Sequence, residues 1–164
     1  MNTPQIGIIM GSQSDLTVMQ EAADILDELQ LRYAMTIVSA HRTPQRLYDY
    51  ANNAVQSGLQ VIIAGAGGAA HLPGMTAALT PLPVIGVPIK SAAFSGQDAL
   101  LSIVQMPPGV PVASVAINGA KNAGILAAQI LGASDPDILQ RIQDYKTGLE
   151  KMVMDSVEAL SPNQ

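Results

Sequence analysis

Cysteine and tryptophan are absent from this sequence, and aromatic residues make up only 3% of it. Without cysteine, the chain can have no disulfides, no thiolate metal ligands and no cysteine nucleophile. The aromatic residues are four Tyr and one Phe, and so small a number disfavours a flavin site. Disulfide, thiolate and flavin chemistry are therefore not expected.

Charged residues are also scarce, at 13% of the chain against about 25% in an average protein. The net charge is −5 and no basic cluster occurs, so the Lys/Arg stripe that nucleic-acid binding needs is missing. With so few charges on 164 residues, much of the surface is poorly suited to water. We therefore predict a homo-oligomer, in which that surface meets other subunits.

Between Tyr50 and Ile89 the sequence contains no Asp, Glu, Lys or Arg. A membrane-spanning helix needs about 20 consecutive apolar residues, and here Asn, Gln, His, Gly and Pro interrupt the run. The stretch is instead typical of buried strands and loops. The amino-terminal segment MNTPQIGIIMGS lacks the basic and apolar regions of a signal peptide. A cytoplasmic protein without membrane contact is expected.

The length predicts one domain over residues 1–164, and alternating apolar patterns predict its fold class. Short apolar runs, mostly rich in β-branched residues, are typical of buried parallel strands. These runs are Ile6–Met10, Met35–Val38, Val61–Ala64, Val84–Val87 and Val112–Ile117. Helical periodicity and capping residues predict helices at residues 16–29, 43–58, 73–80, 97–104 and 120–131. The alternation indicates an α/β fold, a flavodoxin-like doubly wound parallel sheet in three layers.

The last predicted helix, at about residues 135–160, is longer than the others. It opens at Asp135-Pro136 and carries apolar residues at helical spacing, with charges between them. Two arrangements remain open: the helix packs on its own domain, or it reaches onto a neighbouring subunit.

Polar and glycine residues follow four of the predicted strands. In open α/β sheets, ligands bind at the carboxyl ends of the strands, so these segments are expected to form one site. They are Gly11-Ser12-Gln13-Ser14-Asp15, Ser39-Ala40-His41-Arg42-Thr43-Pro44, the glycine-rich run Gly65–Met75, and Ile89-Lys90-Ser91.

The segment that starts at Gly11 joins a strand to a helix N-terminus, where free N–H groups and the helix dipole attract an anion. Ser12 and Ser14 add hydroxyl donors, although Ser14 could equally be a plain helix cap. Asp15 could accept hydrogen bonds from sugar hydroxyls. Arg42 could clamp a phosphate through two N–H groups, or pair with a surface acid. These residues predict a pocket for a phosphosugar or nucleotide.

Both histidines of the chain also follow predicted strands. His41 lies between a buried strand and a helix cap, at the mouth of the expected pocket, where it could carry a proton near neutral pH. His71 lies beside the glycine cluster. Either histidine could instead be structural. Two histidines in separate loops make a poor metal set, so no metal is expected.

The run from Gly65 to Ala70 matches the loose dinucleotide pattern G-x-G-x-x-G/A. No acidic residue follows about 20 positions later to hold a ribose, so a nicotinamide cofactor is not expected. Glycine and alanine instead let a backbone approach a small ligand closely. The motifs of P-loop NTPases, serine hydrolases and zinc peptidases are absent from the sequence.

Four segments together resemble the signature stretches of the PurE family, the N5-carboxyaminoimidazole ribonucleotide mutases of purine biosynthesis. They are Met10–Asp15, Ser39–Pro44, Gly65–Met75 and Ser102–Pro107. The resemblance runs in order over residues 5–145. It implies a flavodoxin-like subunit, a homo-octamer with active sites between subunits, and a reaction that uses no metal, biotin or ATP.

The resemblance also implies a role for each matching residue. His41 is the expected catalytic proton carrier, Ser12 and Arg42 bind the phosphate of the ribonucleotide, and Asp15 takes the ribose hydroxyls. The pocket for the ring and the carboxyl group would be lined by Ser14, Ser39, Ala40, Gly67, Gly68, Ala70, His71 and Leu72. His71 either contacts the ring or supports the glycine loop.

Two alternatives to the mutase remain. One is a direct carboxylase that takes aminoimidazole ribonucleotide and free CO2, but that branch tends to carry lysine where this sequence has Arg42. The other is a non-catalytic module that binds a mononucleotide and does not need His41. The connection Ala116–Ala123 is a few residues shorter than in many PurE relatives, which affects the loop geometry expected there.

Overall fold

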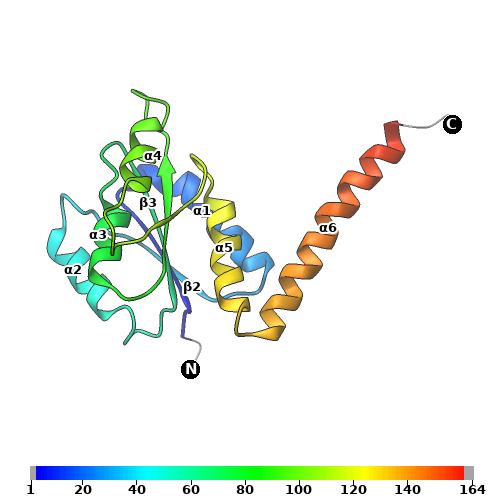
Figure 1. Ribbon diagram of the computed structural model, residues 1–164, viewed down its shortest axis with the longest axis horizontal. Coiled ribbons are helices and arrows are strands. Elements are labelled where there is room, and N and C mark those ends of the chain that lie inside the picture. The colour runs from blue at the N-terminus through cyan, green and yellow to red at the C-terminus, as the bar shows by residue number, and fades with distance from the viewer. Residues whose placement is uncertain (1–2, 161–164) are drawn as a thin grey trace.

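The computed structural model describes residues 3–160 and contains a five-stranded parallel sheet between two layers of helices (Figure 1). The strands are β1 (Ile6–Met10), β2 (Tyr33–Ile37), β3 (Val61–Gly67), β4 (Val84–Ile89) and β5 (Ala113–Ser114). Their order, β2-β1-β3-β4-β5, is flavodoxin-like, so the predicted fold class is confirmed. Residues 1–2 and 161–164 of the predicted domain lie outside the described residues.

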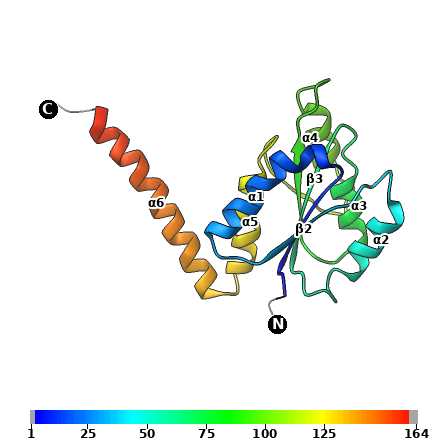
Figure 2. The same cartoon turned by 180° about the vertical axis from the view of Figure 1, so that it is seen from behind.

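Six α-helices and one 3₁₀ turn accompany the sheet within residues 3–160. They are η1 (Gln13–Asp15), α1 (Leu16–Glu28), α2 (Pro44–Asn53), α3 (Leu72–Leu79), α4 (Gln97–Val104), α5 (Ala120–Gly132) and α6 (Pro136–Leu160). Helices α1 and α5 cover one face of the sheet, and α2, α3 and α4 cover the other (Figures 1 and 2).

Strands β1, β3 and β4 are buried on both faces of the sheet because neighbouring side chains of each strand enter separate apolar cores. Ile8 of β1 packs in the core that includes α1 and α5, whereas Ile9 packs in the core that includes α2, α3 and α4. Both side chains are fully buried. Burial on both sides explains why these three strands are continuous apolar runs rather than alternating patterns.

Strand β5 is much shorter than the predicted run Val112–Ile117. It pairs with β4 through only two residues, Ala113 and Ser114. Farther along β4, the carbonyl of Pro88 faces this edge and accepts the N–H of Asn118, but proline has no N–H to donate in return. The ladder therefore stops, and the sequence prediction was wrong about the length of this strand.

Helix α2 also ends before the predicted stop at Gly58. The side-chain amides of Asn52 and Asn53 donate to the carbonyls of Tyr48 and Asp49, each at 2.8 Å. Such bonds compete with the helical backbone pattern, and residues 54–58 form turns instead. Gly58, with φ of 84°, ends those turns rather than the helix.

Helix α6 leaves the body of the molecule (Figures 1 and 2). It begins after Asp135, whose carboxylate accepts the N–H groups of Asp137 and Ile138 at 3.0 and 3.2 Å. Ile138 and Ile142 are buried in the core that includes α5, but every residue from 146 to 160 is exposed. The helix therefore packs on its own domain only at its start. Among the described residues, no helix is both long and apolar enough to cross a membrane.

Candidate functional site

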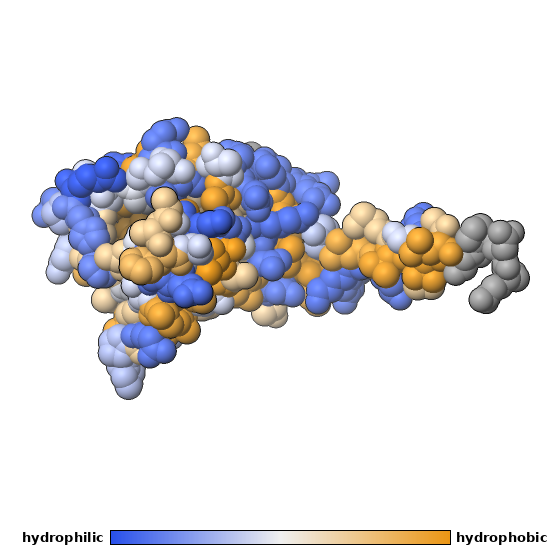
Figure 3. Space-filling view, turned by 90° about the horizontal axis from the view of Figure 1, so that it is seen from above, coloured by the Kyte–Doolittle hydropathy of each residue, from blue (hydrophilic) through white to orange (hydrophobic). Residues whose placement is uncertain are grey.

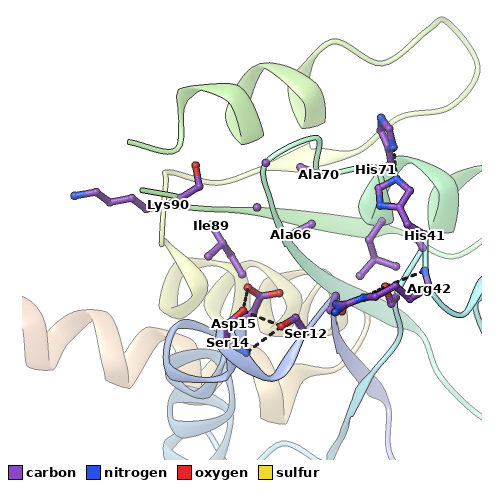
Figure 4. A pocket seen from close by; sticks show the side chains of 17 residues that line it. Ser12, Ser14, Asp15, His41, Arg42, Ala66, Ala70, His71, Ile89 and Lys90 are labelled. Carbon is purple, nitrogen blue, oxygen red and sulfur yellow. Dashed lines mark hydrogen bonds between the residues drawn. The ribbon is translucent and has the colours of Figure 1, made fainter. Parts of the chain in front are cut away.

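Every predicted site residue lines one pocket of about 530 Å³ (Figure 4). The pocket lies at the carboxyl ends of β1, β2, β3 and β4. The chain passes from β1 outward to β2 and then returns to β3 on the other side of β1. The direction in which successive strands are added therefore reverses between β1 and β3. Ligand sites of open α/β sheets form at such switch points.

The loop after β1 is held by its own serines. Ser12 Oγ accepts the N–H of Ser14 at 3.2 Å and lies 2.8 Å from Ser14 Oγ. Ser12 therefore caps the 3₁₀ turn, and the alternative in which Ser14 is a plain cap is wrong. Ser14 instead directs its hydroxyl at the carboxylate of Asp15, at 3.4 Å. The conformation of this loop is thus set by hydrogen bonds within the protein.

Burial raises the pKa of Asp15 above its ordinary value. Hydrogen bonds from Ser14, Ser12 and Gly11 and the charge of Arg42 oppose this effect but do not cancel it. The protein thus offsets only part of the cost of burying the carboxylate charge. Its remaining acceptor capacity suits hydroxyl donors of a ligand in the pocket.

The side chain of Arg42 is fixed at two points. Its Nη2 donates to the carbonyl of Gly11 at 2.7 Å, and its Nε donates to Ser39 Oγ at 3.2 Å. The guanidinium consequently spans from the loop after β2 to the loop after β1 (Figure 4). A guanidinium has five N–H groups, so others remain to bind an anion beside Ser12.

The two histidines meet in the pocket although 30 positions separate them in the sequence. Nε2 of His41 lies 2.6 Å from Nδ1 of His71, and the rings are edge to face at 73°. One nitrogen must donate and the other accept, so the tautomer of one ring is tied to that of the other. His71 thus contacts the predicted proton carrier, and the sequence did not reveal this contact.

The wall opposite Arg42 is formed by the turn after β3. Gly68 and Ala70 have φ of 62° and 45°, and the N–H of Ala70 donates to the carbonyl of Gly67 at 3.2 Å. A left-handed conformation is uncommon for alanine and concentrates at functional sites. The turn brings backbone and small side chains close to the pocket without adding a nucleophile.

The pocket also includes Ala66, Ile89, Lys90 and Ser91, which belong to the segments expected to form the site but were given no individual role from the sequence. Residues 89–91 lie at the carboxyl end of β4, where the rule that ligands bind at strand ends predicts them. The N–H of Lys90 donates to the side chain of Asn118 at 2.9 Å, which ties the short 116–123 connection to this edge. The ammonium of Lys90 points away from His41 (Figure 4).

The fourth signature segment, Ser102–Pro107, lies behind the site rather than in it. Met106 packs against Gly74 of α3, where a Cβ atom would collide with its sulfur. A smaller cavity of about 280 Å³ is lined by Ser102, Met106 and His71. This segment therefore supports the helix that follows His71. Within residues 3–160, no group of three or more acidic or histidine side chains could hold a metal ion.

Comparison with known proteins identifies the family. The sequence model of the AIR carboxylase family matches residues 5–152. The chain belongs to this family. The match includes all four signature segments and every residue of the pocket, so the resemblance to PurE proteins is confirmed.

Individual members of the AIR carboxylase family are close in sequence and in structure. The N5-carboxyaminoimidazole ribonucleotide mutase of Thermotoga maritima is 60% identical over 96% of this chain and 92% of its own length. The phosphoribosylaminoimidazole carboxylase of Schizosaccharomyces pombe is 56% identical over 98% of this chain, but only 29% of its own length is covered. The crystal structure of Treponema denticola PurE superimposes with a TM-score of 0.83 at 29% identity, covering 94% of this chain and 98% of that one.

Proposed function

We propose that this protein is an N5-carboxyaminoimidazole ribonucleotide mutase, an isomerase of purine biosynthesis. It moves a carboxyl group from N5 of the substrate to C4 of the aminoimidazole ring. The observation that carries the proposal is the presence of His41 in one pocket with Arg42, Ser12 and Asp15. A proton carrier thus lies beside groups suited to a phosphate and a ribose. The Thermotoga maritima mutase, at 60% identity, supports this activity.

The proposed substrate lies across the carboxyl ends of the strands. Its phosphate binds Ser12 and Arg42 near Gly11, and its ribose hydroxyls donate to Asp15. The imidazole ring and the carboxyl group then reach His41 and the small-residue wall. The wall residues in this proposal are Ser14, Ser39, Ala40, Gly67, Gly68, Ala70, His71 and Leu72. A fixed Arg42 binds the phosphate with little loss of side-chain freedom.

The proposed chemistry needs one proton carrier. Protonated His41 gives its proton to N5, the N5–carboxyl bond breaks, and neutral aminoimidazole ribonucleotide and CO2 remain in the pocket. C4 of the electron-rich ring attacks the CO2 carbon, and His41 then removes the C4 proton. The histidine ends protonated, as it began. Holding CO2 against the ring supplies the proximity that makes recapture faster than escape.

A second candidate is the direct carboxylation of aminoimidazole ribonucleotide by free CO2. It is favoured by the relative in Schizosaccharomyces pombe, whose name is phosphoribosylaminoimidazole carboxylase. The same pocket and the same proton removal at C4 would serve that reaction. It differs in the source of carbon, which is the solution rather than the substrate.

A substrate assay with and without bicarbonate tests the proposal. Purified protein should convert N5-carboxyaminoimidazole ribonucleotide to 4-carboxyaminoimidazole ribonucleotide without added bicarbonate and without metal, biotin or ATP. A protein that forms this product only from aminoimidazole ribonucleotide and bicarbonate would be a carboxylase. A protein that binds the ribonucleotide and turns over neither substrate would be a binding module.

The proposed assembly is a homo-octamer of single-domain subunits. The apolar stripe of α6 that is buried at Ile138 and Ile142 continues outward through Leu149, Val153 and Val157, which are 40%, 62% and 48% exposed (Figure 3). A stripe of this kind on an isolated helix needs a partner surface. A cytoplasmic location belongs to the proposal because phosphorylated substrates do not cross membranes unaided.

Light scattering tests the assembly. The wild type should give a particle of eight chains of 17.0 kDa each. Val153→Glu places a charge on the apolar stripe and should lower the mass of the particle. Lys151→Glu changes a residue off the stripe and should leave the mass unchanged. A monomeric wild type would overturn the proposed assembly.

A further inference from the structure

Thr43 occupies the N-cap position of α2, yet its hydroxyl makes no hydrogen bond to the free N–H groups of the helix. Thr43 Oγ1 instead donates to the carbonyl of Ser39 and accepts the N–H of Ser39, both at 3.0 Å. The N–H of Thr43 donates to the same carbonyl at 2.9 Å. Three hydrogen bonds therefore join the two ends of the turn that carries His41 and Arg42.

Ser39, where this turn begins, links the hydrogen bonds of Thr43 to the guanidinium of Arg42. Ser39 is only 8% exposed, so its position is fixed by packing as well as by Thr43. Ser39 Oγ accepts the backbone N–H of Arg42 at 3.3 Å and its Nε at 3.2 Å. A shift of Ser39 would displace Arg42, and loosening of the turn would displace His41 between them.

We infer that Thr43 is a positioning residue for both His41 and Arg42. The hydroxyl acts through Ser39 and the turn, since Thr43 does not line the pocket that contains His41. The inference rests on the proposed function, which assigns the roles of His41 and Arg42. A displacement of about 1 Å at reacting groups can reduce a rate by about a hundredfold, so a turn closed by three hydrogen bonds has kinetic consequences.

Two substitutions separate the hydroxyl from the shape of the side chain. Thr43→Val keeps the branched shape and removes the hydroxyl, whereas Thr43→Ser keeps the hydroxyl. With Thr43→Val we expect the KM for the ribonucleotide to rise and kcat to fall, each by about tenfold. Thr43→Ser should stay within about threefold of the wild type for both constants. The matched control is Thr80→Val, which removes a buried hydroxyl bonded to the N–H of Leu82 outside the pocket and should leave both constants unchanged.

Affinity for the product, 4-carboxyaminoimidazole ribonucleotide, gives a second readout by calorimetry. It should fall in Thr43→Val and be retained in Thr43→Ser. If Thr43→Val does not fold, Thr43→Ala removes the same hydroxyl and should show the same pattern. Wild-type kinetics in the variant without the hydroxyl, or equal damage in Thr43→Ser, would overturn the inference. A wild type that neither binds nor converts the ribonucleotide would instead overturn the proposed function.

Discussion

Nε2 of His41 and Nδ1 of His71 lie 2.6 Å apart in the pocket. At this separation one ring nitrogen donates a hydrogen bond to the other, so His71 constrains the orientation and the tautomer of His41. The contact therefore orients the side chain that is proposed to carry the proton.

His41→Asn should remove nearly all turnover while ribonucleotide binding and the oligomer are retained. Asparagine keeps the polarity of the side chain but cannot carry a proton at neutral pH, and general acid–base catalysis is typically worth about 10²–10⁴-fold. Steady-state kinetics together with calorimetric binding of the product would measure both effects. Activity within tenfold of the wild type would remove His41 from the mechanism.

Arg42→Ala should raise the KM for the ribonucleotide by about 10- to 100-fold, because a charge-assisted hydrogen bond is worth about 1.5–3 kcal/mol. The dephosphorylated nucleoside provides the control, since it should bind equally poorly to the variant and the wild type. If the variant still discriminates against the nucleoside as strongly as the wild type does, Arg42 does not bind the phosphate.

Asp15→Asn should weaken ribonucleotide binding without lowering the thermal stability at pH 7. Burial raises the pKa of Asp15, so its ionised form costs folding free energy that asparagine does not incur. The stability of the wild type should fall relative to the variant as pH rises above the ordinary Asp range of about 4. Melting temperatures from pH 3 to pH 7 measure this difference, and a variant that becomes less stable than the wild type with rising pH would contradict it.

Tyr50→Phe should stabilise the fold, by about 1 kcal/mol at neutral pH, because the hydroxyl is buried without a partner beside Gly7. Burial raises the pKa of Tyr50 to about 12. Between pH 10 and 12 the unfolded wild type loses a proton that the folded protein keeps, so the advantage of phenylalanine should grow.

Denaturant unfolding at pH 7 and pH 11 measures the effect of Tyr50→Phe. Tyr48→Phe is the matched control on the same helix, because Tyr48 is 54% exposed. Equal effects of the two substitutions would show that the buried hydroxyl carries no cost.

The order of elements could be predicted because parallel strands buried on both faces are continuous apolar runs, as in Ile6–Met10. The rule that ligands bind at strand ends likewise assigns Ser12, His41 and Gly67 to one edge of the sheet from the sequence alone. These are local patterns combined with one property of the topology. They do not depend on side-chain geometry.

Features that depend on geometry between distant segments could not be predicted. The contact of His41 with His71 requires the conformation of two loops that are 30 positions apart. Strand β5 is short because the backbone of Pro88 faces it and has no N–H to donate. The sequence does not show which neighbouring strand a residue of β4 faces. Thr43 has the sequence context of a plain helix cap. Its hydrogen bond to Ser39 could not be predicted, because Ser39 comes within reach only once the turn has closed.

The origin of the transferred carbon tests the central claim most directly. Substrate labelled at its carbamate carbon should be converted with a large excess of unlabelled bicarbonate, with enough enzyme to outrun spontaneous breakdown and with a control lacking enzyme. If His41 and the small-residue wall keep CO2 in the pocket, mass spectrometry of 4-carboxyaminoimidazole ribonucleotide should show that the label is retained. Product that carries mainly unlabelled carbon would contradict the mutase and identify a direct carboxylase.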